Sequence, residues 1–136
     1  MARYAKPLPD GYWATCIDAL SAAIQREGWT VELYGDLGAN YYGSCNYDTK
    51  TLTLDCPQAR KAFLTLCHED GHRKAASYWG AKDEDHFERL CPRRAFREHQ
   101  ALVFGWHTVQ HYDPEGRITL PAWMREHGLS LTWRGV

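Results

Sequence analysis

Apolar positions recur with a helical period near the start of the chain. Between residues 11 and 28, apolar side chains return every three or four positions, which is the spacing of an amphipathic helix that buries one face. These side chains are Trp13, Ile17, Leu20 and Ile24. Gly28 is a residue type that commonly ends helices, so we predict a first helix over residues 11–28.

Three shorter runs that follow have the composition and the alternation of strands. They are residues 29–34, 41–47 and 51–55. Between the last two lies Asp-Thr-Lys at positions 48–50, which predicts a hairpin turn. We therefore expect a small antiparallel sheet after the first helix.

The second half of the chain is predicted to be helical. A long helix over residues 57–79 should end at Gly80. The charged segment 82–91 predicts one helical turn or a loop, and Pro92 then opens another long helix that reaches about Tyr112.

A short helix around residues 122–127 is expected within a C-terminal tail, 113–136. Together these patterns predict an α+β fold in which the sheet packs on helices.

The length and the charge of the chain limit the classes of protein to which it could belong. A chain of 136 residues suits one domain, 1–136, with an extended N-terminal segment over residues 1–10, where Pro7 and Pro9 lie. The formal net charge is -1 and charges of both signs are interspersed, so no nucleic-acid partner is expected.

There is no apolar stretch of membrane-spanning length and no apolar signal segment, so we expect no membrane and a cytoplasmic location. In that compartment the five cysteines would be reduced thiols.

Residues 68–72 read His-Glu-Asp-Gly-His, an H-E-x-x-H motif inside the predicted 57–79 helix. Side chains four residues apart on a helix project from one face, so His68 and His72 can bind one zinc ion (Zn²⁺). Zinc lowers the pKa of a bound water toward 7, and the adjacent Glu69 can act as general base toward it. The motif therefore predicts hydrolysis of a carbonyl compound by activated water.

A catalytic zinc site needs a third protein ligand, and the spacing alone leaves several candidates. Downstream histidines and one carboxylate are available on the later predicted helices or the connector between them. These candidates are His86, Glu98, His99, His107 and His111.

From about Gly28 to Trp106 the chain resembles the ImmA/IrrE family of zincin-like metallopeptidases. The block Ala-Phe-Leu-Thr-Leu-Cys-His-Glu-Asp-Gly-His at 62–72 resembles the active helix of that family. The run Glu-His-Gln-Ala-Leu-Val-Phe at 98–104 resembles its second motif, whose first Glu is the usual third ligand. The resemblance thus implies Glu98 as the third zinc ligand. Asp70 stands where the family usually has an apolar residue, and it would either face solvent or hydrogen-bond a metal-ligating His.

The same resemblance implies a context for the activity. Family members are commonly encoded by phages, prophages and stress-response loci, and often act on a helix-turn-helix repressor. A protein substrate, such as a repressor or another regulator, is therefore expected, in the host cytoplasm if the chain is phage-encoded.

Two other classes compete with a peptidase. A catalytically silent zinc-binding module could act by binding a partner protein, although such a module has no need of Glu69. A structural zinc domain would fill all four metal positions with protein ligands, and no spacing favours that.

Overall fold

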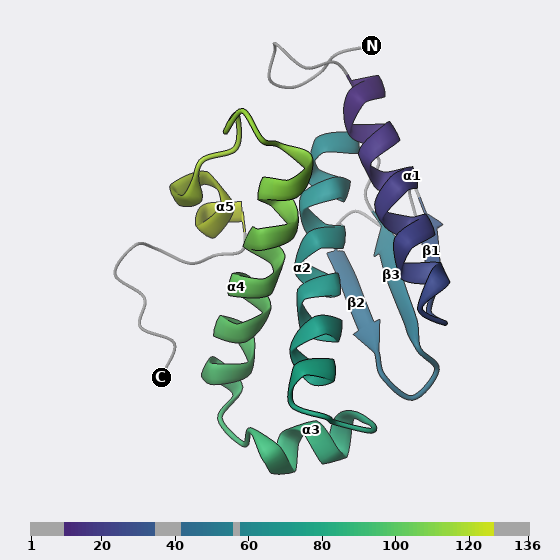
Figure 1. Ribbon diagram of the computed structural model, residues 1–136, viewed down its shortest axis with the longest axis vertical. Helices are drawn as coiled ribbons and strands as arrows, with labels where there is room; N and C mark the ends of the chain where they lie inside the picture. Colours follow the sequence, from purple (N-terminus) through teal and green to yellow (C-terminus); the bar gives the residue numbers. More distant parts are fainter. Residues whose placement is uncertain (1–9, 35–41, 56–57, 127–136) are drawn as a thin grey trace. The chain divides into compact units, whose positions relative to one another are not determined.

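The computed structural model describes residues 10–34, 42–55 and 58–126, and within them the fold is α+β, as predicted (Figure 1). Along the chain, the described elements are α1 (Asp10–Arg26), β1 (Thr30–Tyr34), β2 (Tyr42–Asn46), β3 (Thr51–Asp55), α2 (Ala59–Tyr78), α3 (Glu84–Leu90), α4 (Arg94–Tyr112) and α5 (Leu120–Glu126). No helix in these ranges is long and apolar enough to cross a membrane.

The chain forms two compact units, Met1–Leu66 and Cys67–Val136, and the boundary between them falls inside α2. The first unit holds α1, the sheet and the start of α2. The second holds the rest of α2 and the later helices. The expectation of one domain over 1–136 stays a prediction.

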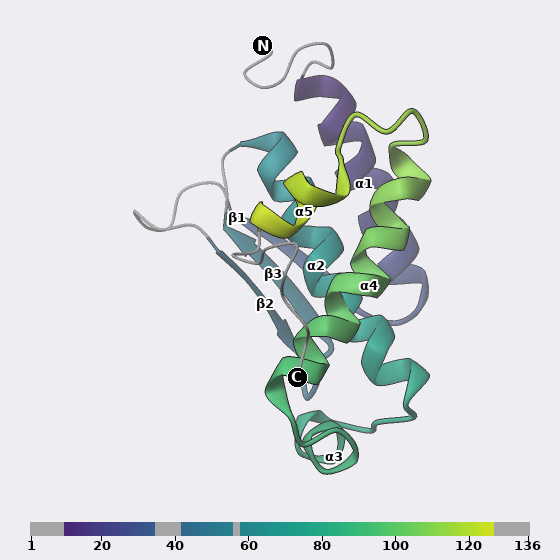
Figure 2. The same cartoon turned by 90° about the vertical axis from the view of Figure 1, so that its left-hand side faces the viewer.

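The sheet of the first unit is mixed, whereas the sequence predicted a wholly antiparallel one. Its strand order is β1-β3-β2, with β3 antiparallel to β2 but parallel to β1 (Figure 2). The hairpin between β2 and β3 was correctly predicted. The direction of β1 was not, because alternation along a strand reveals which face is buried but not which strand is its neighbour.

The hairpin turn is held by a side chain that the sequence pattern did not single out. The Oδ1 atom of Asn46 accepts hydrogen bonds from the backbone N–H groups of Asp48, at 2.9 Å, and Thr49, at 3.0 Å. Lys50 then adopts a left-handed conformation with φ 54°, which returns the chain to β3. An asparagine that binds backbone groups two and three residues ahead is a known turn-forming device.

The core of the first unit contains the apolar stripe predicted for the first helix. Trp13, Ile17, Leu20 and Ile24 are all buried. The ring of Trp13 lies 5.3 Å from that of Phe63, between ring centroids, so α1 contacts the first turns of α2. The central strand β3 contributes buried Leu52 and Leu54.

The second unit is helical in its described part. Asp83 caps the N-terminus of α3, where its side chain accepts a hydrogen bond from the backbone N–H of His86 at 2.8 Å. The sequence predicted one turn or a loop for this segment, and α3 is a helix of 7 residues. α4 and α5 follow close to their predicted ranges.

Some expectations concern residues outside the described ranges. They include the extended segment over residues 1–9, the start of the second helix at Pro57 and the tail after Glu126. Asp10, which was assigned to the extended segment, instead begins α1.

The buried face of β3 generates a stability prediction. Leu52 is fully buried, so Leu52→Ala should lower the free energy of unfolding by about 2–5 kcal/mol through lost burial and the cavity left behind. Thr53→Ala, on the opposite face of the same strand, is the matched control and should cost about 1 kcal/mol or less. Denaturant unfolding measures both, and equal losses would contradict the assignment of the buried face.

Candidate metal centre

Two glycines bring the backbones of α2 and α4 into contact within the second unit. A Cβ atom on Gly71 of α2 would collide with the backbone carbonyl oxygen of Ala101 on α4. A Cβ atom on Gly105 of α4 would lie 2.8 Å from the backbone oxygen of Cys67 on α2. Only residues without a Cβ permit so close an approach, so both glycines are required for this backbone contact.

This contact brings together the three residues predicted as ligands. Nε2 of His68 lies 3.5 Å from one carboxylate oxygen of Glu98, and Nε2 of His72 lies 3.5 Å from the other. One donor atom from each residue lies within 4.8 Å of the others. His68 and His72 project from α2, and Glu98 faces them from α4.

The spacing of these atoms fits a zinc ion. Zinc bonds of about 2.0–2.2 Å in tetrahedral geometry separate neighbouring donor atoms by about 3.3–3.6 Å. The two His-to-Glu distances of 3.5 Å fall in that interval, each to a different carboxylate oxygen of Glu98, and the set with one atom per residue spans up to 4.8 Å. Two imidazoles and one carboxylate are also a common ligand set of catalytic zinc sites.

The charges at the centre are arranged to keep Glu98 ionised. Hydrogen bonds from His68 and His72 hold the pKa of the Glu98 carboxyl well below its usual range, and this outweighs the opposing effect of partial burial. Glu98 is therefore a carboxylate at neutral pH, which is the form that binds a metal.

Glu69 differs from Glu98 in its surroundings. Burial raises the pKa of the Glu69 carboxyl to about 7, His68 opposes that rise, and Glu98 adds to it. Only 8% of Glu69 is exposed. A carboxyl group with a pKa near neutrality can both accept and return a proton, as a general base and acid must.

The other candidate histidines do not join this centre. Among the described residues, His68, His72 and Glu98 form the group of metal-ligating side chains that could hold an ion. His86 instead accepts a hydrogen bond at Nδ1 from the backbone N–H of Lys82. His107 and His111 are exposed on α4, and His99, the neighbour of Glu98, lies outside the group.

Asp70 is buried and ion-paired, and does not face solvent. One of its oxygens lies 2.6 Å from Nε of Arg73 and the other 3.0 Å from Nζ of Lys74. Lys74 also donates a hydrogen bond to Oγ1 of Thr108 on α4, at 2.7 Å. These ion pairs and this hydrogen bond link α2 to α4 through a second set of side chains. The spacing of Asp70, Arg73 and Lys74 along one helix was a readable signal of their pairing.

Trp123 is a residue of the centre that sequence reasoning missed. It is fully buried, and its Nε1 donates a hydrogen bond to the backbone oxygen of Leu102 at 3.2 Å. Its ring packs on Gly105 and lies 6.5 Å from the ring of His68, between centroids. It comes from α5, in a tail for which no motif predicted a contact with the centre.

Comparisons of the chain with models of protein families, with curated proteins and with solved structures find no match.

The contact at Gly71 generates the second prediction. Alanine favours helix over glycine by about 1 kcal/mol, but Gly71→Ala would force α2 away from Ala101. We expect a net loss of about 1–3 kcal/mol in the free energy of unfolding, as for other overpacked sites. Gly11→Ala in α1, where an added Cβ would meet no atom within 4 Å, is the control and should not destabilise. Thermal unfolding of both variants measures the difference, and a stabilised Gly71→Ala would refute the close contact.

Proposed function

We propose that the protein is a zinc-dependent peptidase that hydrolyses a peptide bond in a protein substrate. The observation that carries the proposal is the convergence of His68, His72 and Glu98, from two helices, at distances that suit one zinc ion. Glu69 adjoins this cluster with a pKa suited to proton transfer. A pure binding module would have no use for that last feature.

The ligand set assigns a role to each residue. His68 and His72 would each give a ring nitrogen to zinc, and Glu98 would give a carboxylate oxygen. A zinc ion held there would supply Lewis-acid polarisation of the substrate carbonyl and a lowered pKa for attacking water. Three protein ligands leave a coordination position open, as catalytic sites require.

Glu69 would carry the proton transfers of the reaction. As a carboxylate it accepts a proton from the attacking water, and as a carboxylic acid it returns one to the leaving amine. Burial raises its pKa to about 7 without a metal ion, and the positive charge of a zinc ion beside it would lower that value.

The resemblance to ImmA/IrrE metallopeptidases supports a specific kind of substrate. Residues 62–72 and 98–104 carry that resemblance, and they include all four residues with proposed roles. A helix-turn-helix repressor or another regulatory protein in the cytoplasm is the substrate class that it favours. The alternative is a silent module that binds zinc and a partner protein, and it differs from the peptidase in needing no proton acceptor at Glu69.

Metal content tests the ligand set. Purified protein supplied with zinc and then dialysed should retain about one zinc per chain by elemental analysis. His72→Ala and Glu98→Ala should each lose most of it, because two ligands bind zinc far more weakly than three. His99→Ala, which changes the neighbour of Glu98 on the same helix, should retain zinc. No zinc in the native chain, or its loss in His99→Ala alone, would refute this ligand set.

Cleavage tests the reaction. Native, zinc-loaded protein incubated with a proteome-derived peptide library should generate new termini detectable by mass spectrometry. Glu69→Gln keeps the size of the side chain but cannot accept the proton, so cleavage should fall by about a hundredfold or more while zinc remains bound. Equal cleavage by Glu69→Gln would exclude the proposed mechanism. Zinc binding without cleavage by the native chain would favour the silent module.

A further inference from the structure

One side of α4, away from the metal centre, carries aromatic side chains. Phe96, Gln100 and Phe104 follow one another at intervals of four residues, so they share a face of the helix. Gln100 comes two residues after Glu98, which is a rotation of about 200° around a helix. This face of α4 is therefore opposite to the one that presents the metal ligand.

The end of α2 adds two more rings to this face. The ring of Trp79 lies 6.0 Å from that of Phe96, and its Nε1 donates a hydrogen bond to Oε1 of Gln100 at 3.2 Å. The ring of Tyr78 lies 5.7 Å from that of Trp79 and 5.8 Å from that of Phe104, between centroids. These five side chains form one connected surface, which we call the aromatic face.

The aromatic face is open to solvent. Of Tyr78, 70% is exposed, and of Trp79, 40%, while Phe96 and Phe104 are partly buried beside them. Exposed clusters of large apolar side chains commonly mark a contact with another protein, and aromatic rings are enriched in such contacts. Ring contacts and the Gln100 hydrogen bond already hold these side chains, so binding would cost little conformational freedom.

The charged groups beside the aromatic face are positive. Arg93 lies one turn before Phe96, is exposed, and has no ion-pair partner among the described residues. Arg97, one turn after Arg93, donates a hydrogen bond to the backbone oxygen of Cys91 at 2.6 Å and not to a carboxylate. The single acidic residue of α4 is Glu98, on the opposite side. The positive charge beside the rings is therefore not neutralised by α4 itself.

We infer that the aromatic face binds an acidic segment of another protein. Apolar side chains of that segment would cover Tyr78 and Trp79, and its carboxylates would pair with Arg93 and Arg97. A guanidinium group suits this role because it can donate two parallel hydrogen bonds to one carboxylate. The inference does not depend on the proposed peptidase activity, since the aromatic face shares no residue with the metal centre.

The charges disfavour three other occupants of the aromatic face. A second copy of the chain would bring the same arginines together across a two-fold axis. Residues 127–136 of this chain include His127 and Arg134 but no Asp or Glu. A nucleic acid carries a charge on every nucleotide, and Glu84 and Asp85, in the first turn of α3, would repel it. A protein segment can place a few carboxylates at the arginines alone.

The test is a binding titration with three peptides. The first is acetyl-Glu-Leu-Phe-Glu-Leu-amide, the second has Gln in place of each Glu, and the third has Gly in place of each apolar residue. Each is added to ¹⁵N-labelled, zinc-supplied protein while the assigned indole N–H signals of Trp79 and Trp123 are followed.

We expect the first peptide to shift the Trp79 signal and to bind about tenfold more tightly than either of the others, because it alone offers both charge and apolar surface. The signal of Trp123, which lies beside the metal centre, should stay in place. Equal binding of the Glu and Gln peptides, no shift of Trp79 at millimolar peptide, or a shift of Trp123 alone would overturn the inference.

Arg93→Gln tests the charge at an exposed position. It should remove most of the preference for the Glu peptide over the Gln peptide. Arg94→Gln is the matched control, because Arg94 is also exposed but lies one turn before Glu98, on the other side of α4, and this variant should keep the preference. An unchanged preference in Arg93→Gln, or the same loss in both variants, would refute the role of Arg93.

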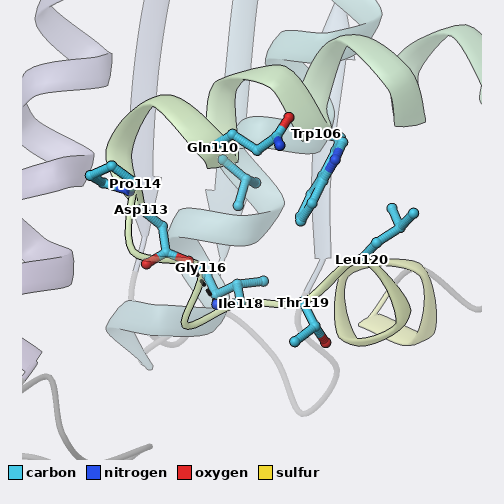
Figure 3. Close-up of a pocket in the computed structure, with 9 residues that line it drawn as sticks. Trp106, Gln110, Asp113, Pro114, Gly116, Ile118, Thr119 and Leu120 are labelled. Atoms are coloured by element: carbon cyan, nitrogen blue, oxygen red, sulfur yellow. Dashed lines mark hydrogen bonds between the residues drawn. The ribbon is translucent and has the colours of Figure 1, made fainter.

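Tyr78→Ser tests the apolar contact at the most exposed ring. It should weaken binding of the Glu peptide by about tenfold through lost apolar burial. Leu120→Ser removes another exposed apolar side chain, at the start of α5 beside the pocket that Figure 3 shows, and should leave binding unchanged. Equal weakening by the two variants would contradict the proposed surface.

Three further results would assign the aromatic face to a different occupant, and each would overturn the inference. A dimer in sedimentation experiments that Tyr78→Ser dissociates would identify a second copy. A shift of the Trp79 signal in Trp133→Ser, without peptide, would identify residues 127–136. Tighter binding of single-stranded oligothymidylate than of the Glu peptide would identify a nucleic acid. A monomer with an unchanged Trp79 signal and weaker DNA binding supports an acidic protein partner.

Discussion

The backbone contact between α2 and α4 is the constraint on which the candidate centre depends. Gly71 and Gly105 allow the two helices to approach until backbone meets backbone. His68 and Gly71 lie three residues apart on α2, and Glu98 and Gly105 lie seven apart, or about two turns, on α4. Ligands and glycines therefore share one face of each helix. A wider separation would carry the Glu98 carboxylate away from both imidazoles.

Two further interactions hold the same pair of helices in place. The ion-paired Asp70 shares Lys74 with Thr108 of α4, and Trp123 packs on Gly105 while binding the Leu102 carbonyl. A buried ion pair adds little net stability, since the cost of removing both charges from water offsets much of their mutual attraction. Its geometric requirement is strict, however, because Asp70 or Arg73 left alone would be a buried charge. Such contacts select one helix arrangement over alternatives of similar packing, and a metal centre requires that selection.

The sequence was most informative where the candidate site depends on residues close together along one helix. His68, Glu69 and His72 could be identified because a helix converts a spacing of four into a common face. Glu98 required the resemblance to a family, since 26 residues and another helix separate it from His72. The parallel pairing of β1 and the position of Trp123 were beyond such reasoning. Both depend on contacts between distant segments, and neither leaves a local period in the sequence.

Asp70 and Asp113 show why buried carboxylates are hard to interpret from sequence. Each lies in a polar stretch where exposure is the ordinary expectation. Asp70 is compensated by two cations that follow it on the same helix, so its burial needs no external partner. Asp113 has one oxygen bound to a backbone N–H and no cation among its partners.

The position of Asp113 links its burial to the candidate centre. Its Oδ2 accepts the backbone N–H of Ile118, five residues ahead, and so holds the loop that leads from α4 into α5. From α5, Trp123 packs on Gly105 and lies 6.5 Å from the ring of His68, between centroids. A hydrogen bond far along the chain from Glu98 therefore helps to place the side chain that packs beside the centre.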